Sequence, residues 1–192
     1  KLSPARLVSG TGFSSANINR RARDPKGVIS LGLNPDGPVD RQIGLIRLET
    51  PAGAPIALIA NYSMHATALG PQNKLISGDA AGTVSAYVEE KIDAPVLFIN
   101  GAAGDLAPIY SVQADFRAAH ITEFNVLLGD KILAANSTMR AAGAEARLRP
   151  IQKIVETPRR AGFGWTPEIG DYLKAAEGEA GVIRMPVRVL IV

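Results

Sequence analysis

The hydrophobic and polar positions of this chain predict a domain that mixes strands with helices. Apolar and polar residues alternate over Val39–Glu49, which is typical of a half-buried strand. Pro55–Tyr62 is apolar on both faces, which predicts a central strand with Ile56 and Leu58 buried. Because the turn residues 50–54 separate the two stretches, we expect an antiparallel hairpin with a longer loop.

A second short apolar run and two helical patterns follow this hairpin. Val96–Asn100 predicts another buried strand, and Gly78–Lys91 has helical spacing with Asp79 at the N-cap position. The longest helical pattern, Phe116–Ala142, contains His120 and ends before a glycine. The other expected elements are a short strand at Ser3–Val8, a loop or weak helix at Ser14–Arg23, strands at Arg147–Thr157 and Ile183–Val192, and a loop with a short helix at Arg159–Gly181. This mixture predicts an α/β fold, a layered domain with mixed sheets flanked by helices.

Composition narrows the class of protein further. The chain has 192 residues, enough for one domain over residues 1–192, and 46% of them are hydrophobic. The net charge of +3 is small and no basic stripe with aromatics is present, so a nucleic-acid partner is not expected. No apolar run has membrane-spanning length, so no transmembrane segment is predicted. The chain begins without methionine and stops in an apolar run, which predicts an internal fragment of a longer protein.

Polar residues that could bind a ligand or take part in catalysis follow the two apolar strands. His65 comes after the first strand, and the glycine-rich loop Gly101–Asp105 comes after the second. Ligands of open α/β sheets bind beyond the carboxyl ends of the strands, so we expect a site there. A histidine at that place can hold a metal or transfer a proton. The absence of cysteine excludes thiolate ligands.

Each of these residues also has a structural interpretation. A lone histidine such as His65 is often a core residue whose ring nitrogens have hydrogen-bond partners. Asp79 can cap its helix, and Asp105 can form an Asx turn. The three clustered arginines Arg20, Arg21 and Arg23 fit a solvated face. The loop Gly101–Asp105 can present N–H groups to an anion, which makes a phosphate-binding protein a third, lower-ranked hypothesis.

The combination of segments is more specific than any one of them. It comprises INRR at 18–21, PVDRQIGLIRLE at 38–49, NYSMHATALGPQNKLISGDAAG at 61–82 and FINGAAGDLAP at 98–108. Together they resemble the N-terminal catalytic domain of the neutral, non-lysosomal ceramidase family, in particular its bacterial ceramidase-like branch. The resemblance runs over about residues 17–192, and it implies that this chain is the central part of such a domain.

The resemblance implies a hydrolase that cleaves an N-acyl amide bond, such as that of N-acylsphingosine, in sphingolipid metabolism. It implies one zinc ion, for which His65 matches a family histidine ligand while the other ligands are expected outside this chain. Arg20 matches the arginine that binds the reacting amide, and Asn19 and Gly104 are assigned to substrate binding. Asp105 is assigned to the catalytic loop. The substrate is then a small-molecule or lipid amide. The resemblance implies secretion or a periplasmic location, while the residues of this chain do not fix the compartment and leave a cytoplasmic location open.

One position departs from the family pattern. Ala107 stands where the family has a catalytic serine, and alanine has no hydroxyl to offer. Two hypotheses from different classes therefore stay open. The first is a zinc-dependent amidohydrolase, and the second is a catalytically inactive or divergent ceramidase-like binding module.

Overall fold

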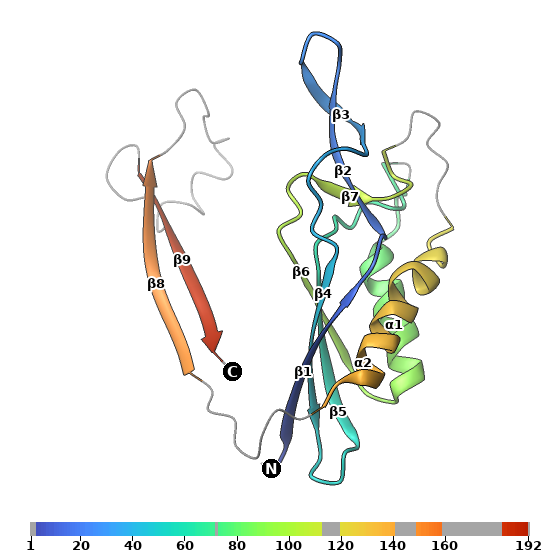
Figure 1. The fold of residues 1–192 in the computed structure, drawn as a ribbon, viewed down its shortest axis with the longest axis vertical. Helices are drawn as coiled ribbons and strands as arrows, with labels where there is room; N and C mark the ends of the chain where they lie inside the picture. Colours follow the sequence, from blue (N-terminus) through green and yellow to red (C-terminus); the bar gives the residue numbers. More distant parts are fainter. Residues whose placement is uncertain (1–2, 72, 113–119, 141–148, 159–181, 192) are drawn as a thin grey trace. The chain divides into compact units, whose positions relative to one another are not determined.

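The computed structural model describes residues 3–71, 73–112, 120–140, 149–158 and 182–191. They separate into two compact units, residues 1–144 and residues 145–192. The elements in chain order are β1 (Arg6–Phe13), β2 (Asn17–Arg23), β3 (Ile29–Asn34), β4 (Gln42–Glu49), β5 (Pro55–Tyr62), α1 (Asp79–Ile92), β6 (Val96–Asn100), β7 (Leu106–Pro108), η1 (Asn125–Gly129), α2 (Asp130–Thr138), β8 (Arg149–Pro158) and β9 (Val182–Ile191) (Figure 1). The expectation of a single domain over residues 1–192 stays a prediction.

A four-stranded mixed sheet in the order β1-β4-β5-β6 organises the first unit. The predicted hairpin is confirmed, since β4 and β5 are antiparallel with Ile46 opposite Ile59. β5 and β6 are parallel, and α1 provides the crossover connection that a parallel pair requires. The carboxyl ends of β5 and β6 therefore lie side by side, and the loops that follow them start at the same edge.

Helices cover one face of this sheet (Figure 1). Leu58 and Ala60 of β5 are fully buried against Val84 and Val88 of α1 and against Phe124. Burial of each large apolar side chain contributes about 1.5–3 kcal/mol, so this layer is a main source of the unit's stability. The mixed sheets with flanking helices are confirmed, although the unit has more strand than a typical layered α/β domain.

The expectation of a strand buried on both faces is wrong for β6. Val96 is buried and Phe98 packs against the core, but Leu97 is 54% exposed. Ile56, expected in the core, is also exposed. The reason for Leu97 is that β6 is the last strand of the sheet and the helices cover one face, so alternate side chains face solvent. Ile56 shares the face of the buried Leu58, but it lies at the start of β5, before the stretch from Leu58 onward that pairs with β6.

The second sheet, in the order β3-β2-β7, contains an element that the sequence pattern does not predict. Ser14–Arg23 was expected as loop or weak helix, and that expectation is wrong because Asn17–Arg23 is strand β2. Its buried positions include Asn17 and Asn19, which are polar, so the hydrophobic pattern of a strand is missing. Pairing with β3 on one side and β7 on the other stabilises the strand instead.

The helical prediction over 116–142 is confirmed within the described residues from Asn125 to Thr138, as η1 followed by α2. The placement of His120 inside this helix is wrong. His120 is exposed, and its backbone carbonyl accepts the Glu123 N–H at 2.7 Å in a turn that precedes the helix. Residues 116–119 and 141–142 of the prediction lie outside the described residues. None of the described helices is long and apolar enough to cross a membrane.

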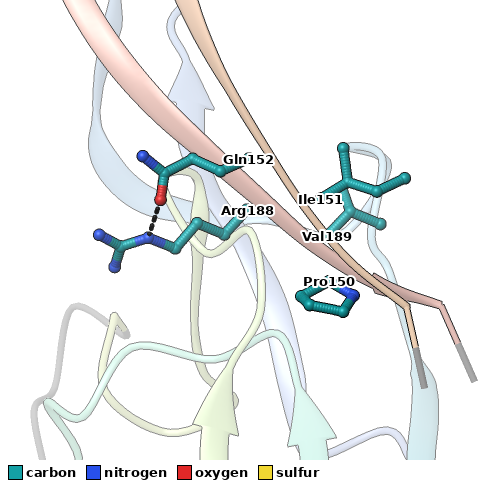
Figure 2. A pocket seen from close by; sticks show the side chains of 5 residues that line it. All are labelled: Pro150, Ile151, Gln152, Arg188 and Val189. Atoms are coloured by element: carbon teal, nitrogen blue, oxygen red, sulfur yellow. Dashed lines mark hydrogen bonds between the residues drawn. The ribbon is translucent and has the colours of Figure 1, made fainter.

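The second unit is an antiparallel pair, β8 with β9, which confirms both strand predictions within the described residues. One face is polar, since Arg188 donates to Gln152 at 3.0 Å and Arg184 pairs with Glu156 at 3.1 Å. Figure 2 shows the Gln152–Arg188 pair beside a hollow of about 350 Å³. The loop and short helix expected at 159–181 lie outside the described residues.

Candidate functional site

Three segments that are far apart in the sequence meet at one edge of the first unit. β2 and β7 are antiparallel with Asn19 opposite Leu106, and the Arg20 N–H donates to the Asp105 carbonyl at 2.8 Å. The His65 N–H donates to the Leu106 carbonyl at 3.3 Å. Backbone hydrogen bonds therefore hold the β2 segment, the loop after β5 and the loop after β6 together.

The Arg20 side chain links the other two segments. Its Nη2 atom lies 2.6 Å from His65 Nε2 and donates to the Gly104 carbonyl at 3.1 Å. A guanidinium has only donors, so the imidazole accepts through Nε2 and the geometry assigns its proton to Nδ1. Arg20 Nε is buried and has no partner among the described residues. The predicted site residues Arg20, His65 and Gly104 are thus in direct contact.

His65 is held in its neutral form. Burial lowers the pKa of His65, and the positive charges of Arg20 and Arg21 lower it further. Neutral imidazole is the form that binds a metal ion, and because Nδ1 carries the proton, a metal would bind at Nε2 in place of the Arg20 contact. The described residues contain no group of three or more His, Cys, Asp or Glu side chains that could hold a metal. A zinc site needs about four ligands, so the role of His65 as a zinc ligand stays a prediction.

Asp105 is oriented by the buried amide of Asn19. Asn19 Nδ2 donates to Asp105 Oδ2 at 3.2 Å and to the Pro38 carbonyl at 3.0 Å, and Asn19 Oδ1 accepts the Arg21 N–H at 2.9 Å. Asn19 is only 2% exposed, so the structure shows it as a link between β2 and the Gly104–Asp105 loop. Its assignment to substrate binding stays a prediction. Ala107 is fully buried in β7, opposite Ile18.

Asp79 has a role that differs from the predicted helix cap. Gly78 occupies the N-cap position, and Asp79 begins α1 with a left-handed φ of 53°. The Asp79 carboxylate accepts the N–H groups of Ala68 and Leu69, both at 2.9 Å, and of Ala80 at 2.7 Å. Asp79 therefore fastens the loop that follows His65 to the start of α1.

A pocket of about 530 Å³ lies between this loop, β2 and β3. Arg20 lies in its wall, together with apolar side chains and hydroxyl groups. The apolar contributions include Leu31, Leu69 and Val112, and the hydroxyl groups belong to Thr67, Ser77 and Ser111. Sequence reasoning did not select these residues. Of these residues, Thr67, Leu69 and Ser77 lie within the segment 61–82 on which the resemblance rests, and Leu31, Ser111 and Val112 lie outside the quoted segments.

Known proteins resemble this chain in part of its sequence and in its fold. No family model matches the chain. Neutral ceramidase B of Dictyostelium discoideum is 31% identical over 100 residues, which are 48% of this chain and 13% of that protein. Neutral ceramidase A of the same organism is 36% identical over 91 residues, or 46% of this chain and 12% of that protein. The chain thus spans about an eighth of the length of these curated relatives.

Two solved structures share the fold. Neutral ceramidase from Pseudomonas aeruginosa superposes with a TM-score of 0.66 at 16% identity, over 100% of this chain and 39% of that one. A structure described as ceramidase complexed with C2 superposes with a TM-score of 0.63 at 19% identity, over 81% of this chain and 25% of that one. The resemblance to neutral ceramidases that the motifs indicated is therefore confirmed. The matched sequences are from Dictyostelium, so assignment to a bacterial branch stays a prediction.

Proposed function

We propose that this chain is part of a zinc-dependent amidohydrolase related to the neutral ceramidases, acting on the amide bond of an N-acyl lipid or a smaller N-acyl compound. The supporting observation is the contact of Arg20 with both His65 and Gly104, which joins three separate segments in one site. The names of the matched relatives support the same reaction class.

In this proposal His65 is one zinc ligand and the remaining ligands come from outside the described residues. Zinc, when bound, supplies Lewis-acid polarisation of a carbonyl oxygen. Arg20 stabilises the negative charge that develops on that oxygen, because a guanidinium held in a partly buried site interacts strongly with an anion. Asn19 and Asp105 hold the Gly104 loop in position. The apolar part of the pocket beside Arg20 accommodates the acyl chain.

The test uses the full-length protein. Its zinc content is measured, and hydrolysis of N-acylsphingosine and of simple N-acyl amides is followed before and after treatment with a chelator. We expect hydrolysis that the chelator abolishes and that added zinc restores, whereas magnesium does not restore it. Hydrolysis that continues in the chelated, zinc-free protein contradicts the proposal.

A ceramidase-like binding module without catalysis is the second candidate function, and one observation favours it. Ala107 has 0% exposure and offers no hydroxyl at the position of the family's serine. In this case the pocket binds an N-acyl lipid but releases it unchanged. Saturable binding of N-acylsphingosine without product formation in the zinc-loaded protein distinguishes this candidate from the first.

A further inference from the structure

Arg21 reaches the same carbonyl group as Arg20. Arg20 Nη2 and Arg21 Nη2 donate to the Gly104 carbonyl at 3.1 Å and 2.9 Å. Neighbouring residues of a regular strand point to opposite faces, so this convergence requires an irregular backbone. The β2–β3 pair is irregular at this place, since two residues of β3 stand opposite Arg20. A bulge of this kind increases the local twist and redirects side chains.

The nearby carboxylates are already engaged. The Asp105 carboxylate accepts from Asn19, and the Asp79 carboxylate accepts from three backbone N–H groups. The ion pairs among the described residues involve Arg6, Arg47, Lys91 and Arg184, which lie elsewhere. Neither Arg20 nor Arg21 forms an ion pair with a carboxylate of the described residues, and both donate to one neutral carbonyl oxygen. A bound anion offsets the repulsion between such charges, and a carboxylate matches the planar fork of a guanidinium.

One arginine of the pair, Arg20, lines the pocket. Leu31, the β3 residue opposite Arg21, lies in the same wall. Leu31 is 68% exposed, so an apolar surface extends outward from the two charges. An amphiphile with an anionic group at the arginines can place its hydrocarbon chain along Leu31, Leu69 and Val112.

We infer that the substrate of this site is an N-acyl amide that carries a carboxylate on the amine side, that is, a compound of the N-acyl amino acid class. Arg21 binds the carboxylate together with Arg20, and Arg21 thereby determines specificity. This inference rests on the proposed function, because it assumes that the pocket beside Arg20 binds the amide to be cleaved.

The test is a binding measurement on the catalytically relevant full-length protein, made with matched probes. Calorimetry at low salt compares N-dodecanoylglycine, its neutral counterpart N-dodecanoylethanolamine, and dodecanoate. The variants are Arg21→Gln and Arg23→Gln, since Arg23 is an exposed arginine two residues further along the same strand. Circular dichroism verifies that each variant is folded.

We expect the wild-type protein to bind N-dodecanoylglycine about tenfold more tightly than the neutral amide, because charge-assisted hydrogen bonds are the stronger ones. Arg21→Gln should remove most of this preference, and Arg23→Gln should leave it unchanged. Equal affinity for the two amides, an equal loss in both variants, or tighter binding of dodecanoate than of N-dodecanoylglycine overturns the inference. Since binding is measured, a preference for the anion without hydrolysis contradicts the proposed reaction and leaves the carboxylate site standing.

Discussion

Arg20 Nη2 lies 2.6 Å from His65 Nε2, although the two residues are 45 positions apart in the sequence. Arg20 is on β2 and His65 follows β5, so the contact depends on the pairing of β2 with β7. The lone pair of His65 Nε2 that accepts the hydrogen bond from Arg20 is also the one that a metal ion would bind. Protonation of His65, zinc binding and the position of Arg20 are therefore coupled.

The first prediction concerns the pKa of His65. Burial, Arg20 and Arg21 all lower this pKa below the ordinary value of 6.5. The folded protein therefore favours neutral His65. Its contribution to stability is present above the unfolded pKa and is lost as the pH falls through the lower, folded pKa.

An NMR titration of His65 in the metal-free protein measures this pKa. We expect a value below the ordinary 6.5. Arg21→Gln should raise the pKa of His65 because it removes a positive neighbour. A midpoint for His65 at or above 6.5 contradicts the prediction.

The second prediction concerns zinc. In the full-length protein, His65→Ala should remove most of the bound metal and any hydrolytic activity, because a tetrahedral site loses one of about four ligands. His120→Ala is the matched control, since the chain has only these two histidines and His120 is exposed in a turn. Metal analysis after dialysis measures the effect. Full zinc occupancy in the His65→Ala protein shows that His65 is not a ligand.

The third prediction compares two aspartates with left-handed backbone. Asp79 and Asp93 have φ values of 53° and 51°. Glycine relieves the backbone cost at either position, but Asp79→Gly also leaves the N–H groups of Ala68 and Leu69 without their acceptor. We expect Asp79→Gly to lower the free energy of unfolding by about 1–3 kcal/mol.

The exposed Asp93 follows the last residue of α1, where glycine is favoured, so Asp93→Gly should stabilise by about 1 kcal/mol. Denaturant unfolding measures both variants. Equal effects at the two positions contradict the role of Asp79 in fastening the loop. Hydrogen exchange at the Ala68 and Leu69 amides should increase in Asp79→Gly and stay unchanged in Asp93→Gly.

The fourth prediction concerns the missing hydroxyl. Ala107→Ser introduces a hydroxyl at a fully buried position, so stability should fall by about 1 kcal/mol. If the site is a divergent hydrolase, the same variant should raise the rate of amide hydrolysis. Ala103→Ser, in the loop after β6 and also buried, is the matched control. A rate that is equal in Ala107→Ser, Ala103→Ser and wild type shows that position 107 has no catalytic role here.

The sequence pattern within a segment was sufficient to predict those elements in which apolar side chains alternate with polar ones according to burial. The hairpin β4–β5, helix α1 and the strands β8 and β9 follow from apolar spacing and turn residues within each segment. The motifs around Arg20, His65 and Gly104 also indicated by resemblance which residues belong to one site. Secretion or a periplasmic location, implied by the same resemblance, stays a prediction.

Only the tertiary structure decided the features that depend on distant partners. β2 is a strand because it pairs with β3 and β7, and its buried Asn17 and Asn19 mask the strand pattern. The exposure of Leu97 depends on β6 ending the sheet. Asp79 holds the loop after His65 by accepting the Ala68 N–H. Arg20 and Arg21 both donate to the Gly104 carbonyl, which belongs to another segment. Hydrophobic periodicity reports which side of a segment is buried, but it does not report which other segment lies against it.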